Sequence, residues 1–169
     1  TDDTLIVFTS DHGENLGSHG LVQKGTENDE SIRIPFVMAG PGVAQTRING
    51  SVASLVDLAP TFLAVAGAAI PDHMHGASLM DEAGGADSTG RDAFFQTTQG
   101  VGIRSCDIIV YATLDDRQIT DAPCTVFDMQ ADPFQYKNLA GTGAGAALFS
   151  RLKHLDQIFP WSELQDDPQ

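Results

Sequence analysis

A short loop near the start of the chain gathers side chains that can bind a metal ion and an anion. Asp11 and His12 follow an apolar run, and Lys24 stands thirteen residues after Asp11. Aspartate offers a hard oxygen and neutral histidine a softer nitrogen, so this pair can hold a divalent cation if other segments add donors. A lysine ammonium suits a tetrahedral oxyanion, and the chain has only three lysines. His19, in the same loop, is a further candidate for catalysis.

Each of these residues also has a structural interpretation. Asp11 can cap a turn, His12 can be a polar surface residue, and Lys24 can serve solubility. His19 can equally be a loop histidine held by a hydrogen bond. His73 and His75 have the spacing of a metal pair, but a metal role is not the preferred interpretation of this pair.

The composition excludes some classes of function. The chain has 169 residues, 41% of them hydrophobic, and a formal net charge of −14. Such a charge argues against binding nucleic acid or an anionic membrane, because phosphates need Lys and Arg to neutralise them. No apolar run approaches the roughly 20 residues that span a bilayer. The chain opens without Met almost directly into an apolar run, so we expect it to begin inside a larger protein.

The elements that must position the loop can be predicted from hydrophobic patterning. Residues 5–8 and 34–39 are apolar runs typical of strands covered on both faces. Residues 54–67 predict a helix, on which Leu58, Phe62 and Val65 form a core-facing stripe. Strands that alternate with helices indicate an α/β sheet, and the loop with Asp11 would lie at its carboxyl edge. Residues 81–92, rich in Gly, Asp and Ser, predict a linker.

The second half of the chain has a different character. Short apolar runs at 94–95, 101–103, 108–111 and 125–127 predict a small antiparallel sheet. Residues 145–159 predict a helix that Pro160 stops, with an apolar stripe of Leu148, Leu152, Leu155 and Phe159. We therefore expect two parts, residues 1–85 and 86–169. Cys106 and Cys124 are too few for a disulfide framework, and buried free thiols are preferred over a cross-strand bridge between them.

Four segments in this order resemble the sulfatase family of the alkaline-phosphatase-like superfamily. They are DDTLIVFTSDHGENLGSHGLVQK, ESIRIPFVMAGPGV, SLVDLAPTFLAVAGAAIP followed by HGASL, and VFDMQADPFQYKNLA. The last departs from the family pattern, with Met129 for the usual Leu and Phe134-Gln135 where Gly-Glu is common. The resemblance implies the C-terminal part of an alkaline-phosphatase-like α/β sandwich, followed by a small α+β subdomain with an antiparallel sheet and one helix.

The resemblance also implies roles for residues of the loop. Asp11 and His12 would be metal ligands, and Lys24, with His19, would act on the sulfate group. Calcium is the expected metal, with manganese or a similar ion as the alternative because histidine replaces an amide ligand. The family's nucleophile is a formylglycine made from a Cys/Ser-x-Pro-x-Arg motif, which is absent here, as are the paired aspartates that complete the metal site.

The chain is accordingly interpreted as a C-terminal fragment of a sulfatase whose nucleophile lies upstream. The fragment alone is expected to be inactive, to bind metal weakly and to self-associate through apolar surface that the missing N-terminal part would cover. One alternative is a phosphonate monoester or phosphodiester hydrolase of the same superfamily. Phosphoethanolamine transferases share Ser-Asp-His-Gly-Glu but tend to have histidine near the place of Lys24. Another alternative is a non-catalytic binding module that keeps the fold.

Overall fold

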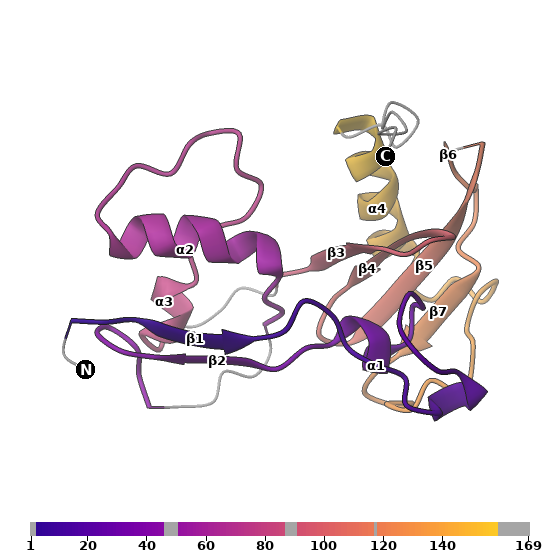
Figure 1. The fold of residues 1–169 in the computed structure, drawn as a ribbon. Coiled ribbons are helices and arrows are strands. Elements are labelled where there is room, and N and C mark those ends of the chain that lie inside the picture. The colour runs from indigo at the N-terminus through magenta and orange to yellow at the C-terminus, as the bar shows by residue number, and fades with distance from the viewer. Residues whose placement is uncertain (1–2, 46–50, 87–90, 117, 159–169) are drawn as a thin grey trace, which may run out of the picture. The chain divides into compact units, whose positions relative to one another are not determined.

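The structure, a computed structural model, describes residues 3–45, 51–86, 91–116 and 118–158. The chain divides into two units, one of Thr1–Lys24 and Asp29–Asp92, the other of Gly25–Asn28 and Ala93–Gln169. The chain thus combines an α/β part with a small α+β part built on an antiparallel sheet, as the sequence predicts (Figure 1). No helix among the described residues is long and apolar enough to span a membrane.

The first unit contains two strands and several short helices. They are β1 (Ile6–Thr9), η1 (Ser18–Gly20), α1 (Asp29–Ile32), β2 (Phe36–Ala39), η2 (Leu55–Asp57), α2 (Leu58–Val65) and α3 (Met80–Ala83). The strands pair antiparallel, with Phe8 opposite Val37. Directly paired residues share a face of a sheet, and Ile6 joins them because side chains alternate along a strand.

The two strands are not covered on both faces, so that part of the prediction is wrong for the described residues. Ile6, Phe8 and Val37 are 53%, 64% and 57% exposed. A sheet of two strands has no further strand to extend it and no second layer on this face among the described residues. The apolar runs therefore predict the strands correctly and their burial incorrectly.

The helix predicted over residues 54–67 is present as η2 and α2, but its core-facing stripe is wrong. Phe62 and Val65 are 48% and 47% exposed, whereas Pro60 and Thr61 are buried. The buried side of α2 packs against the segment that leads into α3, where Thr61 Oγ1 accepts a hydrogen bond from the Leu79 amide at 3.0 Å. The helix thus buries the side with Pro60 and Thr61 and leaves the side with Phe62 and Val65 exposed.

The predicted linker is helical at its start. Residues 81–83 belong to α3, and Arg91 near the linker's end forms ion pairs with Asp57 (2.7 Å) and Glu82 (3.3 Å). Residues 87–90 lie outside the described residues. The acidic and basic side chains of this segment therefore tie it to the first unit, which ends at Asp92.

The second unit is built on a sheet of β3 (Ala93–Gln96), β4 (Gly100–Arg104), β5 (Ile108–Asp115), β6 (Gln118–Ile119) and β7 (Thr125–Asp128). The order is β3-β4-β5-β6, β7 also pairs with β5, and all pairs are antiparallel. The predicted antiparallel sheet is confirmed, and β6 is an addition that its two residues were too short to signal. Residues 25–28 join this unit through Thr125, whose hydroxyl donates to Glu27 at 3.1 Å.

Helix α4 (Ala146–Ile158) covers one face of this sheet and closes the core. Leu148 and Leu152 are 8% and 0% exposed, as the helical stripe predicts, whereas Phe159 and Pro160 lie outside the described residues. The core cluster consists of Val101, Ile103, Val110, Ala112, Ile119, Val126, Leu148 and Leu152. Cys106 and Cys124 are free thiols, as preferred from the sequence, but Cys124 is exposed and Cys106 half-buried.

Candidate functional site

The end of β1 presents the first two candidate side chains. The strand stops at Thr9, and the hydroxyl of Ser10 then donates to the His12 carbonyl at 2.7 Å. This turn leaves the Asp11 side chain 82% exposed, with Oδ1 accepting from the His12 amide at 3.0 Å. The pKa of the Asp11 carboxyl is lowered, chiefly by its own backbone N–H and also by the backbone N–H of His12 and the positive charge of Lys24. Asp11 is therefore an ionised, accessible oxygen donor.

His12 is the centre of the candidate site. Its Nδ1 lies 2.7 Å from the Gly13 carbonyl, which can only accept, so Nδ1 carries the proton and Nε2 the lone pair in the neutral ring. The ammonium of Lys24 lies 2.7 Å from this Nε2, and Asp11 Oδ2 lies 3.5 Å from it. Metal-binding histidines commonly donate their second N–H in this way, to a carbonyl or a carboxylate. The three predicted residues Asp11, His12 and Lys24 thus meet at one ring nitrogen.

The loop between His12 and Lys24 is held in place by two features. Gly13 lies against α1, where its amide donates to the Ser31 carbonyl at 2.9 Å and an added Cβ would come within 2.0 Å of the Glu30 carbonyl oxygen. Asn15 is 2% exposed, and both its amide and its side-chain Nδ2 donate to the Gln23 carbonyl, at 3.0 and 2.7 Å. This clamp brings the residue before Lys24 back to the start of the loop.

His19 faces a carboxylate on α1. Its Nε2 lies 3.7 Å from Glu30 Oε2, and Ser18 donates to Glu30 Oε1 at 2.5 Å. Burial acts to raise the pKa of Glu30, but the Ser18 hydroxyl, a backbone N–H and His19 together lower it. His19 has a left-handed backbone (φ 54°), which orients its ring within the turn of η1. The structure therefore places His19 against Glu30, with the loop-histidine arrangement that the sequence left open.

The segment with His73 and His75 is anchored through a buried carboxylate. Asp57, 3% exposed, accepts from the amides of Ser54 and Ala77 at 2.9 Å each and from Arg91 at 2.7 Å. Its bond to Ala77 fixes the chain two residues after His75. Among the residues that the structure describes, no group of three His, Cys, Asp or Glu side chains could hold a metal ion. Asp11 and His12 therefore do not form a complete metal site with other described residues.

Sequence reasoning missed Asn15, Glu30 and Asp57, which position the candidate residues. Asn15 carries no motif of its own, because its partner is a backbone carbonyl that any residue type provides. Asp57 forms a capping box with Ser54, which a Ser-x-x-Asp pattern signals, but its bonds to the Ala77 amide and to Arg91 leave no local pattern. Glu30 stands in the acidic run ENDE, where it looks like one solvated charge among several. Gly13 also carries a signal, since a glycine directly after Asp-His is suited to a close backbone approach.

Comparison with known proteins places these residues in a family context. A family model described as Sulfatase matches residues 1–68. The multifunctional alkaline phosphatase superfamily protein PehA of Trinickia caryophylli is 35% identical over 92% of this chain and 36% of its own length. The N-acetylglucosamine-6-O-sulfatase of Bacteroides thetaiotaomicron is 32% identical over 97% of this chain and 31% of its own length.

Solved structures of sulfatases and related hydrolases are similar to this chain over most of its length. The BT4656 protein in complex with its substrate D-glucosamine-2-N,6-O-disulfate has a TM-score of 0.74 and 26% identity, over 99% of this chain and 37% of that one. The phosphonate monoester hydrolase SpPMH from Silicibacter pomeroyi has a TM-score of 0.69 and 26% identity, over 93% of this chain and 34% of that one. The chain spans about a third of the length of these proteins.

Proposed function

Because this chain belongs to the sulfatase family of the alkaline-phosphatase-like superfamily, we propose that it is the C-terminal part of a hydrolase that cleaves sulfate esters. The observation that carries the proposal is the convergence of Asp11, His12 and Lys24 on the Nε2 lone pair of His12. An acid, a neutral imidazole and an ammonium at one point can serve a cation and an anion together. Sulfated sugars are the proposed substrate class, since two of the similar proteins are described as acting on them.

In this proposal Asp11 and His12 are ligands of a divalent metal. The exposed, ionised Asp11 carboxylate and the Nδ1-protonated imidazole fit the donor types that such an ion requires. Calcium is the expected ion and manganese the alternative. When bound, the ion would polarise the sulfate oxygens as a Lewis acid. The remaining donors and the formylglycine nucleophile would come from a preceding segment of the same protein, because the described residues hold no third donor.

Lys24 has two tasks in this account. Its ammonium donates to His12 Nε2, the atom that a metal would use, so metal and Lys24 compete for one lone pair. Metal binding would release the ammonium to the sulfate oxygens, where a positive charge stabilises charge that develops during ester cleavage. His19, held by Glu30, would be a second cationic or hydrogen-bonding group near that anion.

The apolar faces of the first unit suit the proposed N-terminal partner segment. Ile6, Phe8 and Val37 on the sheet, and Phe62 and Val65 on α2, are each about half exposed or more. Exposed apolar surface of this kind marks an interaction site. We expect it to be covered by the preceding part of the same protein, and to drive self-association of the chain when that part is missing. Light scattering that shows a monomer over a wide concentration range would contradict this.

The main alternative is a phosphonate monoester hydrolase. The observation in its favour is the similarity to SpPMH, which is as high in sequence identity as that to BT4656. Lys24 is compatible with both reactions, because sulfate and phosphonate present similar tetrahedral oxyanions. A non-catalytic module would not need Asp11, His12 and Lys24 to converge.

Competition between metal and Lys24 can be tested directly on the chain. Isothermal titration with Mn²⁺ and with Ca²⁺ should show weak binding by the unchanged chain and tighter binding by Lys24→Met, which removes the competing N–H. Asp11→Asn should weaken binding, and Lys137→Met, which removes an exposed lysine elsewhere, should leave it unchanged. Equal affinities for the Lys24→Met, Asp11→Asn and unchanged chains would contradict the assigned metal site.

A further inference from the structure

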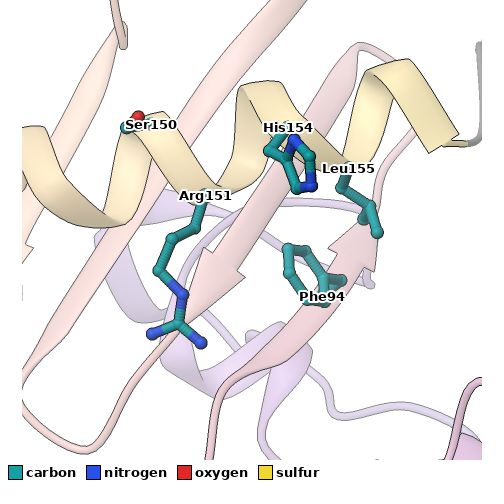
Figure 2. Close-up of a pocket in the computed structure, with 5 residues that line it drawn as sticks. All are labelled: Phe94, Ser150, Arg151, His154 and Leu155. Carbon is teal, nitrogen blue, oxygen red and sulfur yellow. The ribbon is translucent and has the colours of Figure 1, made fainter.

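A hollow of about 390 Å³ lies between α4 and the edge strand β3 of the second unit. It is lined by Phe94 from β3 and by Ser150, Arg151, His154 and Leu155 from α4. Figure 2 shows the Phe94 ring directly below the His154 imidazole, with Arg151 extending to one side and Leu155 to the other. Pockets that hold small molecules have volumes of about 300–1,000 Å³, so the hollow is large enough for a small ring.

The hollow exists because the helix covers only part of the sheet. Phe94 pairs directly with Ile103, so both side chains lie on the same face. Ile103 is fully buried under α4 together with Leu152, whereas Phe94, on the edge strand, is 38% exposed. The helix thus packs over the inner strands and leaves Phe94 only partly covered at the open edge of the sheet.

The lining combines an aromatic face with two hydrogen-bond donors. Arg151 and His154 are three residues apart on α4 and therefore project from the same side of the helix. A guanidinium has five N–H donors in a planar fork that matches sulfate and carboxylate oxygens, and these donors can serve more than one acceptor. The imidazole adds a donor in either protonation state. No acidic residue is among the described residues that line the hollow.

The charged side chain in the lining of the hollow favours an anionic ligand. The chain carries a formal net charge of −14, whereas the lining of the hollow includes Arg151 and His154 and no acidic residue. The hollow is therefore more favourable to an anion than most of the acidic surface. Phe94 in turn suits the apolar C–H face of a ring, because burying such a face is favourable. An anionic group on a ring with an apolar face satisfies both parts of the lining.

A second hollow, of about 370 Å³, adjoins the first. Arg151 lines both, and the second is completed by Ser105, Ile108, two glycines just before α4 and the first three residues of α4. Two neighbouring hollows that share a cation fit consecutive units of an oligomer better than a single enclosed molecule. Most of the residues that line the first hollow are exposed, as a site for part of a longer chain requires.

We propose that this pair of hollows is a secondary binding site for a sulfated oligosaccharide, with a sulfate-bearing sugar ring on Phe94 and its sulfate on Arg151. The choice of sulfate over another anion rests on the proposed function. The site would anchor a polymeric substrate at a point outside the loop that carries Asp11, His12 and Lys24, and its own residues perform no chemistry.

Binding can be measured on the chain by NMR titration with N-acetylglucosamine 6-sulfate, with N-acetylglucosamine and with inorganic sulfate. We expect the sulfated sugar to shift the amide signals of Phe94 and residues 150–155, and the neutral sugar to act far more weakly. Arg151→Gln and Phe94→Ala should each weaken binding about fivefold or more, because each removes one half of the recognition. Lys137→Gln, which removes an exposed charge outside the hollow, should change nothing.

Three results would overturn the proposal: no shifts at the hollow, equal shifts with inorganic sulfate, or equal binding by Arg151→Gln and Lys137→Gln. Spectra of the variants outside residues 94 and 150–155 report whether the fold is intact. Because the measurement needs no turnover, it is independent of the proposed hydrolase activity. No sulfate-ester hydrolysis by a longer protein that includes the preceding segment, together with intact binding at the hollow, would refute the proposed function alone. Hydrolysis by that protein without binding at the hollow would refute the secondary site alone.

Discussion

Replacing Asp57 should destabilise the first unit, because its carboxylate joins three segments. It lies at the junction of η2 and α2, and it accepts hydrogen bonds from Ser54, from Ala77 and from Arg91. Its side chain is 5% exposed and that of Arg91 is 21% exposed. In Asp57→Ala, two backbone N–H groups and most of a guanidinium would lose their acceptor in a largely dry environment.

The size of the effect follows from these contacts. Removing one partner of a buried ion pair costs about 3–5 kcal/mol, because the other charge stays behind. Arg91 is partly exposed and keeps Glu82 at 3.3 Å, so the lower end, about 3 kcal/mol, is expected. Asp57→Asn keeps the shape and one acceptor oxygen but loses the charge, and it should cost about 1–2 kcal/mol.

Urea denaturation followed by circular dichroism measures these differences. Asp72→Ala is the matched control, since Asp72 is an exposed aspartate of the same unit and should change the free energy of unfolding by less than about 0.5 kcal/mol. The reasoning would be refuted if Asp57→Ala and Asp72→Ala unfolded at the same urea concentration. It would also be refuted if Asp57→Asn were as damaging as Asp57→Ala, because the retained acceptor would then be irrelevant.

Three further predictions concern local features. Gly13→Ala should lower the free energy of unfolding in urea by about 3 kcal/mol, because its Cβ would lie 2.0 Å from a backbone oxygen. Gly17→Ala has open space around its Cβ but a φ of 95°, and it should lower the free energy by about 1 kcal/mol. Equal losses for the two variants would contradict this reasoning. The pKa of Glu30 is lowered in the folded protein, so its ionised carboxylate should stabilise the fold fully above pH 4.5, its ordinary pKa, and this stabilisation should be lost as the pH falls through the folded-state pKa. Glu30→Gln should remove this part of the pH dependence of the free energy of unfolding. The same pH dependence in Glu30→Gln and the unchanged chain would contradict the prediction. A thiol reagent should find two thiols in unfolded protein and label Cys124 before Cys106 in folded protein. The absence of any free thiol in unfolded protein would indicate a bridge between them.

The sequence predicts individual elements better than it predicts what covers them. The runs at β4, β5 and β7 are buried apart from half-buried Ile108, because their partners lie within the same unit. On the predicted α4 stripe, Leu148 and Leu152 are buried for the same reason and Leu155 is half-buried. The equally apolar β1, β2 and α2 are exposed on the sides where the described residues offer no partner. An apolar pattern shows that a face needs cover, and the cover itself depends on other segments.

The candidate site also has a part that the sequence predicts and a part that it does not. The types of Asp11, His12 and Lys24 indicate their chemistry, and the structure brings these three side chains together. The clamp from Asn15 to the Gln23 carbonyl was not predictable, because a backbone acceptor leaves no trace in the sequence.

The most direct test of the central claim is turnover by the proposed longer protein, in which a segment with the nucleophile would precede this chain. Hydrolysis of an aryl sulfate and of the matching aryl phosphonate would be compared, with Lys24→Ala as the site variant and Lys137→Ala as the control. The account predicts a higher kcat/KM for the sulfate, a loss of about 100-fold or more in Lys24→Ala, and none in Lys137→Ala. A preference for the phosphonate, or full sulfate turnover by Lys24→Ala, would contradict it.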